Sequence, residues 1–379
     1  MNIEQLLHRL DALTPLVRSQ AGEADQLTRL SDAVIHELRA LGLFKLWVPQ
    51  HYDGRELELV DTLRIYEAAG RIDGSLGWAV MIGSGGGLFA AYLEPTTASE
   101  LYARNDTVIA GSGAPTGRAE QVTNGYRVSG HWRYASGAHY ATTFTANCVI
   151  THDGQTVLDA QGKPLIRAMA FTPTQVTIHS TWNTSGMRGT GSHDFSVQDV
   201  FVPQAHTFSL FTDTVREPGP LYRLPFTVLT ELPIAAVGLG LARQALDAFA
   251  ALAQAKKCPD GTTPLAAHPL TQARVVHSDT RFRGLQIEIY ELATRTWQVA
   301  IANRPLTATE LNEITDSCVR CMIDLQRAIS ELASLAGMSA ITQDNEFARA
   351  WRDLQTLTAH TAVSPLRMTH SDDRRERAQ

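Results

Sequence analysis

The sequence predicts a mostly helical α+β protein in which a β-domain lies between two helical domains. Apolar residues recur at helical spacing in the first part of the chain, switch to a period of two in the middle, and then return to helical spacing. The middle region is also rich in β-branched and aromatic residues. We therefore expect an N-terminal helical domain (1–110), a β-barrel or β-sandwich domain (111–212), and a C-terminal four-helix bundle with a short solvated tail (213–379).

Helical spacing in the N-terminal region is clearest in the strings IEQLLHRLDALTPLV and LSDAVIHELRALGLF. The string GLFKLWVPQHYDG at 42–54 interrupts it, because a proline and a glycine mark the exit from a helix. The string ELVDTLRIYEAAGRI then restores the 3.6-residue period, so we expect a further helix there.

The middle region reads as successive strands, for example QVTNGYRVSGHWRY and HDFSVQDVFVP. The pairs Asn124-Gly125 and Asp153-Gly154 lie between alternating runs and predict two tight hairpins. Beyond Pro220, helical spacing returns in four long segments, at 226–256, 266–303, 307–338 and 344–362. The interfaces between the β-domain and the helices are the expected ligand crevice.

Composition excludes several classes of protein. The 379 residues are 44% hydrophobic and 19% charged, as in an ordinary globular enzyme. The formal charge of −6 gives no reason to expect nucleic acid or an anionic membrane as a partner, although local basic patches stay open at this point. The longest apolar stretches, such as LPIAAVGLGLA at 232–242, fall short of the ~20 residues that cross a bilayer. The N-terminus lacks a signal-peptide core, so we expect a cytoplasmic protein.

The four cysteines are too few and too unevenly spaced for a disulfide framework. Cys318 and Cys321 form a CxxC inside a helical pattern without a second pair of metal ligands nearby. We therefore expect buried or half-buried helix residues there, and no metal site.

Four strings in order carry a resemblance through nearly the whole chain: AAGRIDGSLGW at 68–78, VTNGYRVSGHWRYASG at 122–137, TWNTSGMRGTGSHDFSVQDVFVP at 181–203, and NEFARAWRDLQTLTAHTA at 345–362. With the order helices, strands, helices, they resemble the acyl-CoA dehydrogenase superfamily. That superfamily contains dehydrogenases and flavin-dependent monooxygenases.

A dehydrogenase needs a carboxylate that removes an α-proton. The stretch that resembles one family position for it, LTAHTAVSPLRM, holds no acid. At the other family position stands Thr230, with Glu231 beside it; one residue turns a helical side chain by roughly 100°. Whether Glu231 serves as a base stays open at this point.

The resemblance favours the oxygenase component of a two-component monooxygenase. Dehydrogenases of this family carry an Arg-x-x-Phe-Gly string that grips FAD, and KKCPDGTTPLAAHPLTQARVVHS lacks it. The resemblance implies reduced flavin (FADH2 or FMNH2) from a separate NAD(P)H-flavin reductase, and O2. Through a C4a-hydroperoxyflavin, one oxygen atom enters an indole- or phenol-like aromatic or heteroaromatic molecule. The alternatives are an acyl-CoA dehydrogenase with an atypical base and a catalytically inactive flavoprotein or assembly partner.

Candidate site residues follow from the same resemblance. Ser136, with Gly137 in the string HWRYASG, matches the family serine beside flavin N5, and Trp132 is the expected isoalloxazine neighbour. A serine that caps a turn and a plain core tryptophan are the structural alternatives. Thr190 and Ser192, in RGTGSHD, are expected to contact the flavin, and ordinary turn chemistry explains the same letters.

His360 follows Arg352-Asp353 by seven residues, as does the family histidine that faces the flavin. An imidazole there is suited to proton transfer or to stabilising the peroxide. We expect Arg352 and Asp353 themselves to be structural, as an Arg–carboxylate pair.

The substrate pocket is expected at Trp78, Gly83 and Ser84. Several phenol- and thiophene-oxidising relatives carry a histidine at the place of Gly83, so a pocket opened by glycines would admit a bulkier substrate such as an indole, or Ser84 would serve as donor. The resemblance also implies a homo-oligomer, a tetramer or a dimer. The apolar string LPIAAVGLGLARQALDAFAALA is compatible with such an interface and equally with an internal core.

Overall fold

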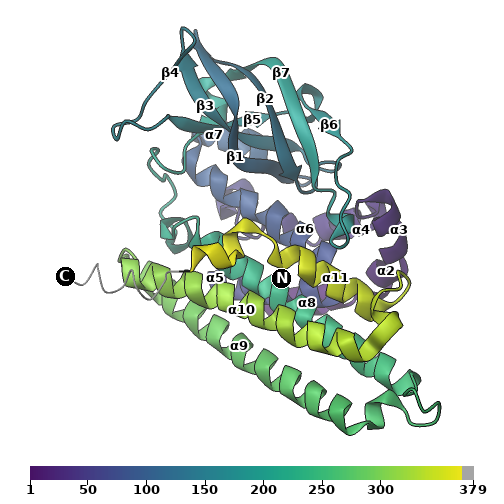
Figure 1. Cartoon of the computed structure of the whole chain (residues 1–379). Coiled ribbons are helices and arrows are strands. Elements are labelled where there is room, and N and C mark those ends of the chain that lie inside the picture. Colours follow the sequence, from purple (N-terminus) through teal and green to yellow (C-terminus); the bar gives the residue numbers. More distant parts are fainter. Residues whose placement is uncertain (369–379) are drawn as a thin grey trace.

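The computed structural model describes residues 1–368 as a β-domain packed against two sets of helices (Figure 1). The predicted fold class is confirmed: N-terminal helices, a central mixed sheet and long C-terminal helices follow one another. The solvated tail expected at SDDRRERAQ lies outside the described residues.

The N-terminal region is helical, as its periodicity predicts. Its α-helices are α1 (Ile3–Asp11), α2 (Thr14–Ser19), α3 (Ala21–Leu27), α4 (Asp32–Ala40), α5 (Leu59–Ile72), α6 (Gly74–Gly85) and α7 (Pro95–Tyr102). Asp73 begins α6, because its side chain accepts the Leu76 amide at 3.0 Å and so satisfies a backbone donor of the first turn. Helix α6 is buried along most of its length, which makes it a rigid support for the side chains that it carries.

The middle region forms one mixed sheet with strand order β6-β7-β2-β1-β3-β5-β8. Its strands are β1 (Ile109–Val122), β2 (Gly125–Ala135), β3 (Thr143–His152), β4 (Gln155–Thr156), β5 (Ile166–Phe171), β6 (Thr177–His179), β7 (His193–Pro203) and β8 (Thr207–Phe208). Strands β1 and β3 pair in parallel, and β4 pairs with β3. Both predicted hairpins are present, with positive φ at Asn124, Asp153 and Gly154.

The C-terminal region consists of α8 (Val228–Ala255), α9 (Pro269–Ile301), α10 (Ala308–Ala336) and α11 (Glu346–Thr358), which match the four predicted segments. Helix α8 is long and apolar enough to cross a membrane, but 78% of its most apolar window is buried inside the molecule. The apolar string at 232–253 is therefore the internal core of the bundle. Cys318 and Cys321 are free thiols buried on α10, as expected for structural cysteines.

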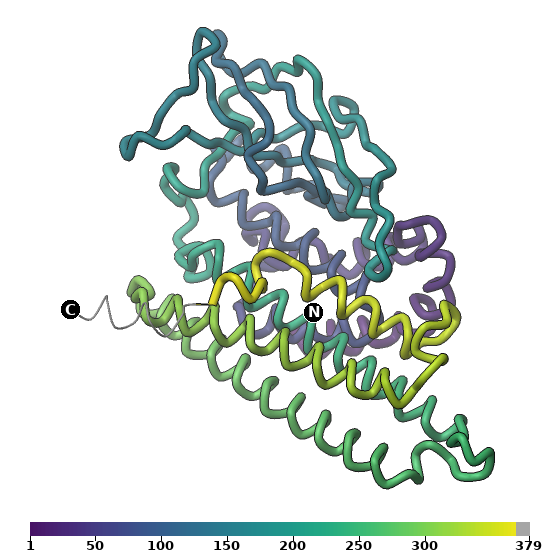
Figure 2. Tube along the Cα trace, in the orientation of Figure 1, coloured from purple at the N-terminus to yellow at the C-terminus, as the bar shows by residue number. Residues whose placement is uncertain are grey.

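Glycines bring the N-terminal and C-terminal helices into close contact. A Cβ at Gly240 of α8 would lie 2.0 Å from the Glu67 carbonyl oxygen of α5, and one at Gly70 would lie 2.7 Å from the Val237 carbonyl oxygen. Helix α6 contacts both α8 and α11. Figures 1 and 2 show α6 and the yellow C-terminal segment between the β-domain and the long helices, so three regions of the chain meet there.

Candidate active site

Three side chains from the three regions meet beside α6. The indole Nε1 of Trp78 donates to the hydroxyl of Ser136 at 2.8 Å, and the ring of Trp78 contacts the ring of His360 with centroids 5.3 Å apart. Trp78 is on α6, Ser136 follows β2, and His360 follows α11. The structure thus brings together three of the predicted site residues around one tryptophan.

A distortion at the end of β2 places Ser136. The pairing of β2 with β7 shifts between Trp132 and Ala135, and Tyr134 adopts a left-handed φ of 68°. Such bulges turn a strand away from its regular path and redirect the following side chains. Gly137 then adopts φ 79° and donates its N–H to the Thr190 carbonyl at 2.9 Å, which ties this turn to the loop before β7.

A chain of hydroxyl groups runs from Ser136 into that loop. The Ser136 and Ser192 hydroxyl oxygens are 2.7 Å apart, and so are those of Ser192 and Thr190. Thr190 donates in turn to the Met187 carbonyl at 2.9 Å. Thr190 and Ser192, predicted as cofactor contacts, therefore lie behind Ser136 and connect it to the backbone.

His360 is held as a neutral imidazole with its proton on Nε2. Its Nδ1 accepts the Ala362 amide at 3.2 Å, so Nδ1 carries no proton. Burial, and then the charge of Arg367, lower the pKa of His360 below its ordinary value. Within residues 1–368, Nε2 makes no hydrogen bond, so its N–H remains a donor for a bound molecule.

A buried network of charged side chains connects the helices and the loop that carry the site residues. Arg349 lies 2.9 Å from Asp73 and 2.5 Å from Asp25, and Asp353 accepts the Met187 amide at 2.5 Å. Burial is the main reason that the pKa of Asp353 is raised to about 7. The network joins α3, the start of α6 and α11 to the loop that carries Thr190.

Asp353 has the expected structural role, but the predicted pairing with Arg352 is wrong, because the arginine whose charge acts on Asp353 most strongly is Arg349. Arg352 donates to the backbone carbonyls of Ser185 and Thr342 instead. Arg349, Asp73 and Asp25 were not predicted from the sequence, although an aspartate that precedes an apolar helix is a recognisable capping signal.

Three predicted residues lie elsewhere. Trp132 is 0% exposed in the β-domain core, where it stacks with Phe195 and donates to the Asn147 carbonyl at 2.9 Å, so it presents no face to a ligand. Gly83 does not open a pocket, because the ring of Phe44 fills the adjacent space, 2.4 Å from where a Cβ would stand. Ser84 is buried and hydrogen-bonds Tyr66 and the α6 backbone.

Glu231 is committed to a structural role. One of its carboxylate oxygens accepts from Arg367 at 2.6 Å and the other from Thr315 at 2.9 Å. Burial raises the pKa of this carboxyl, and these two partners oppose the rise. Both oxygens are thus engaged away from the Ser136 hydroxyl chain, in contrast to a catalytic base that points at substrate.

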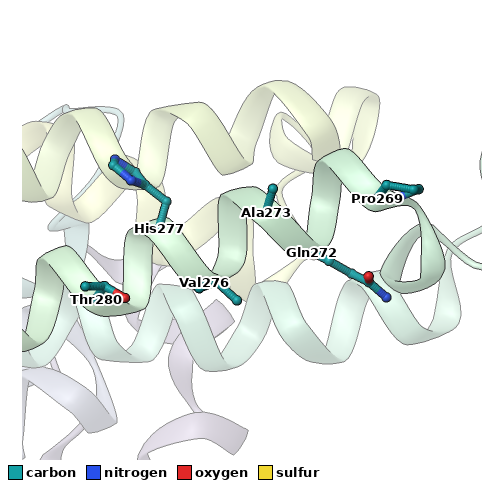
Figure 3. A pocket seen from close by; sticks show the side chains of 6 residues that line it. All are labelled: Pro269, Gln272, Ala273, Val276, His277 and Thr280. Carbon is teal, nitrogen blue, oxygen red and sulfur yellow. The ribbon is translucent and has the colours of Figure 1, made fainter.

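A shallow depression lies along the outer face of α9 (Figure 3). All its lining residues belong to that one helix: Pro269, Gln272, Ala273, Val276, His277 and Thr280. It shares no residue with the Trp78 cluster and has no polar groups that converge from different elements, so it is not the candidate active site. Within residues 1–368, no group of three or more His, Cys, Asp or Glu side chains is arranged to hold a metal ion.

Comparisons with known proteins agree with this architecture. The chain matches the family models "Acyl-CoA dehydrogenase, N-terminal domain" over 13–97 and "Acyl-CoA dehydrogenase, C-terminal domain" over 232–365. It is 30% identical over 344 residues to the indole-3-acetate monooxygenase of Pseudomonas putida, which covers 90% of this chain and 86% of that protein. The enzyme of the same name from Acinetobacter baumannii is 29% identical over 93% of this chain and 89% of its own length.

Among solved structures, XiaF from a Streptomyces species in complex with FADH2 and glycerol has a similar fold, with a TM-score of 0.86. It is 22% identical, and the match covers 96% of this chain and 92% of XiaF. The chain therefore belongs to the flavin-dependent monooxygenases that share the acyl-CoA dehydrogenase fold, and is an oxidoreductase.

Proposed function

We propose that this protein is the oxygenase component of a two-component monooxygenase. It takes reduced flavin, FADH2 or FMNH2, from a separate NAD(P)H-flavin reductase and uses O2 to place one oxygen atom on an indole- or phenol-like small molecule. The second oxygen atom leaves as water. The observation that carries this proposal is the contact of both Ser136 and His360 with Trp78, whereas the carboxylate of Glu231 is engaged by Arg367 and Thr315.

The residues present fit a flavin. Ser136 has an unused lone pair next to a buried indole, and Gly137 fixes the turn that presents this hydroxyl by donating to the Thr190 carbonyl. Reduced flavin supplies the two electrons and the activation of O2. The protein holds a neutral Nε2–H donor at His360, which is suited to hydrogen-bond a developing negative charge on oxygen.

An aromatic substrate is supported by side chains around the same turn. The ring of Tyr140 is partly exposed and lies beside this turn, where a Cβ at Gly137 would stand 2.9 Å from it. Flat aromatic surfaces of this kind favour flat aromatic ligands. The two indole-3-acetate monooxygenases to which the chain is similar support the same substrate class.

The experiment is a single turnover with ¹⁸O2. The protein is mixed anaerobically with FADH2 or FMNH2 and with indole-3-acetate, indole or a phenol, and then exposed to ¹⁸O2. Product that contains one ¹⁸O atom supports the proposal, and its yield should fall at least tenfold in His360→Ala. Tight binding of oxidised FAD that bleaches on addition of an acyl-CoA, without any oxygenated product, would instead identify a dehydrogenase.

A homo-oligomer, either a tetramer or a dimer, is the second part of the proposal. On the outer face of α9, Val276 is 66% exposed and Ile287 is 59% exposed, and nothing lies within 4 Å of a Cβ built at Gly284 between them. This stripe of apolar and small residues is suited to packing against a second copy of the chain. Light scattering should give a mass of at least twice 41.4 kDa, and Val276→Glu with Ile287→Lys should reduce it to that of one chain.

A further inference from the structure

The direction of the hydrogen bonds behind Ser136 is fixed at both ends of the chain of hydroxyls. At one end, the Met187 carbonyl has no proton to give, so the Thr190 hydroxyl donates to it. Thr190 has one proton, and therefore Ser192 must be the donor in its bond with Thr190. By the same count, Ser136 must be the donor in its bond with Ser192.

At the other end, Trp78 Nε1 is a donor only and occupies one lone pair of Ser136. With its single proton committed to Ser192, Ser136 retains one lone pair and no proton for a bound molecule. Toward a bound molecule, this buried hydroxyl can therefore accept a hydrogen bond but cannot donate one.

This polarity distinguishes the two redox states of a flavin. Reduced flavin carries a proton on N5 and is a donor there, whereas N5 of oxidised flavin offers only a lone pair. We propose that Thr190 and Ser192 determine specificity for reduced flavin, because they orient the Ser136 hydroxyl as an acceptor. The inference rests on the proposed function and on the family resemblance that places Ser136 beside flavin N5.

N5 of oxidised flavin can receive a hydrogen bond from Ser136 only if the three hydroxyl groups of Ser136, Ser192 and Thr190 reverse the direction of their hydrogen bonds. The Thr190 hydroxyl must then release the Met187 carbonyl, which keeps two other donors, Trp182 Nε1 at 2.9 Å and the Thr190 backbone N–H at 3.2 Å. Reversal therefore loses one hydrogen bond, which corresponds to a preference for reduced flavin of roughly two- to tenfold. Each tenfold change in this preference moves the midpoint potential of bound flavin by ~30 mV.

The test measures the dissociation constants of oxidised and reduced FMN and FAD by anaerobic fluorescence titration. Thr190→Val keeps the shape of the side chain but disconnects Ser192 from the Met187 carbonyl, and Ser192→Ala removes the acceptor of the Ser136 proton. Either change lets Ser136 donate to N5, so the ratio of oxidised to reduced dissociation constants should fall by roughly two- to tenfold. The two variants remove different hydroxyl groups, so one of them still tests the inference if the other does not fold.

The matched control is Thr184→Val. Thr184 lies in the same loop and donates to the Gly186 carbonyl at 2.7 Å, but it is not part of the hydroxyl chain, so the ratio should not change. Thr190→Ser should also keep the wild-type ratio, because the hydroxyl remains. An unchanged ratio in both Thr190→Val and Ser192→Ala, with flavin still bound, would overturn this inference alone. Wild-type protein that binds neither redox state would overturn the proposed function itself.

Discussion

Asp353→Asn should change how the stability of this protein depends on pH. Asp353 is 2% exposed and, with Asp73 and Asp25, surrounds the single guanidinium of Arg349. Burial raises the pKa of Asp353 to about 7, with a further contribution from the charge of Asp73, while Arg349 acts in the opposite direction. In Asp353→Asn, the amide oxygen can still accept the Met187 N–H, but the titrating charge is gone.

The direction in which stability changes with pH follows from the protons that the folded and unfolded states bind. The ordinary pKa of this group is 3.8, so between about pH 4 and pH 7 the folded state binds a proton that the unfolded state does not. The resulting stabilisation is complete below about pH 4 and is lost as the pH rises through 7. At ~1.36 kcal/mol per pH unit, the interval from pH 5 to pH 7 corresponds to roughly 2 to 3 kcal/mol. For a chain of 379 residues this is a melting-temperature change of about 3 °C.

The assay compares melting of the wild type and Asp353→Asn by circular dichroism from pH 5 to pH 8. Groups that titrate in both proteins, such as His139 and His193, cancel in the difference. The melting temperature of the variant minus that of the wild type should rise by about 3 °C from pH 5 to pH 8. Asp153→Asn, the same chemical change at an exposed hairpin residue, should leave the difference flat. A flat difference for Asp353→Asn as well would refute the assigned pKa and the network behind it.

Two further predictions follow from contacts around the site. Gly83→Ala should lower the free energy of unfolding by roughly 1–3 kcal/mol, because its Cβ would lie 2.4 Å from the Phe44 ring. Gly85→Ala in the same helix meets nothing within 4 Å and should be neutral or stabilising by up to ~1 kcal/mol; urea unfolding of both variants checks the contrast, and equal effects would contradict it. Arg367→Gln removes a charge that lowers the pKa of His360, so protonation of the imidazole should begin at higher pH. The acid limb of the curve of turnover rate against pH should therefore shift to higher pH. An unshifted limb would show that the protonation of His360 does not limit the reaction.

The sequence by itself determined the order of the three regions and most of their helices and strands. These depend on local properties: apolar spacing sets the helices and strands, and residues that tolerate positive φ, such as Asn124 and Gly154, set the hairpins. The motifs also indicated Ser136, His360 and Trp78, which the structure brings into contact.

Only the tertiary structure decided where individual side chains point and which partners they have. Trp132 belongs to a string that also holds Ser136, yet the pleat of β2 directs it into the core of the β-domain. The space beside Gly83 is filled by Phe44 from a distant segment. Glu231 is engaged by Arg367, 136 residues away in the chain. Likewise, the Ser136 hydroxyl can only accept a hydrogen bond from a bound molecule, because the Met187 carbonyl and Trp78 Nε1 fix the direction of its hydrogen-bond chain from the two ends. Contacts between segments so far apart in sequence leave no periodic signal, because they arise only when the three regions pack together.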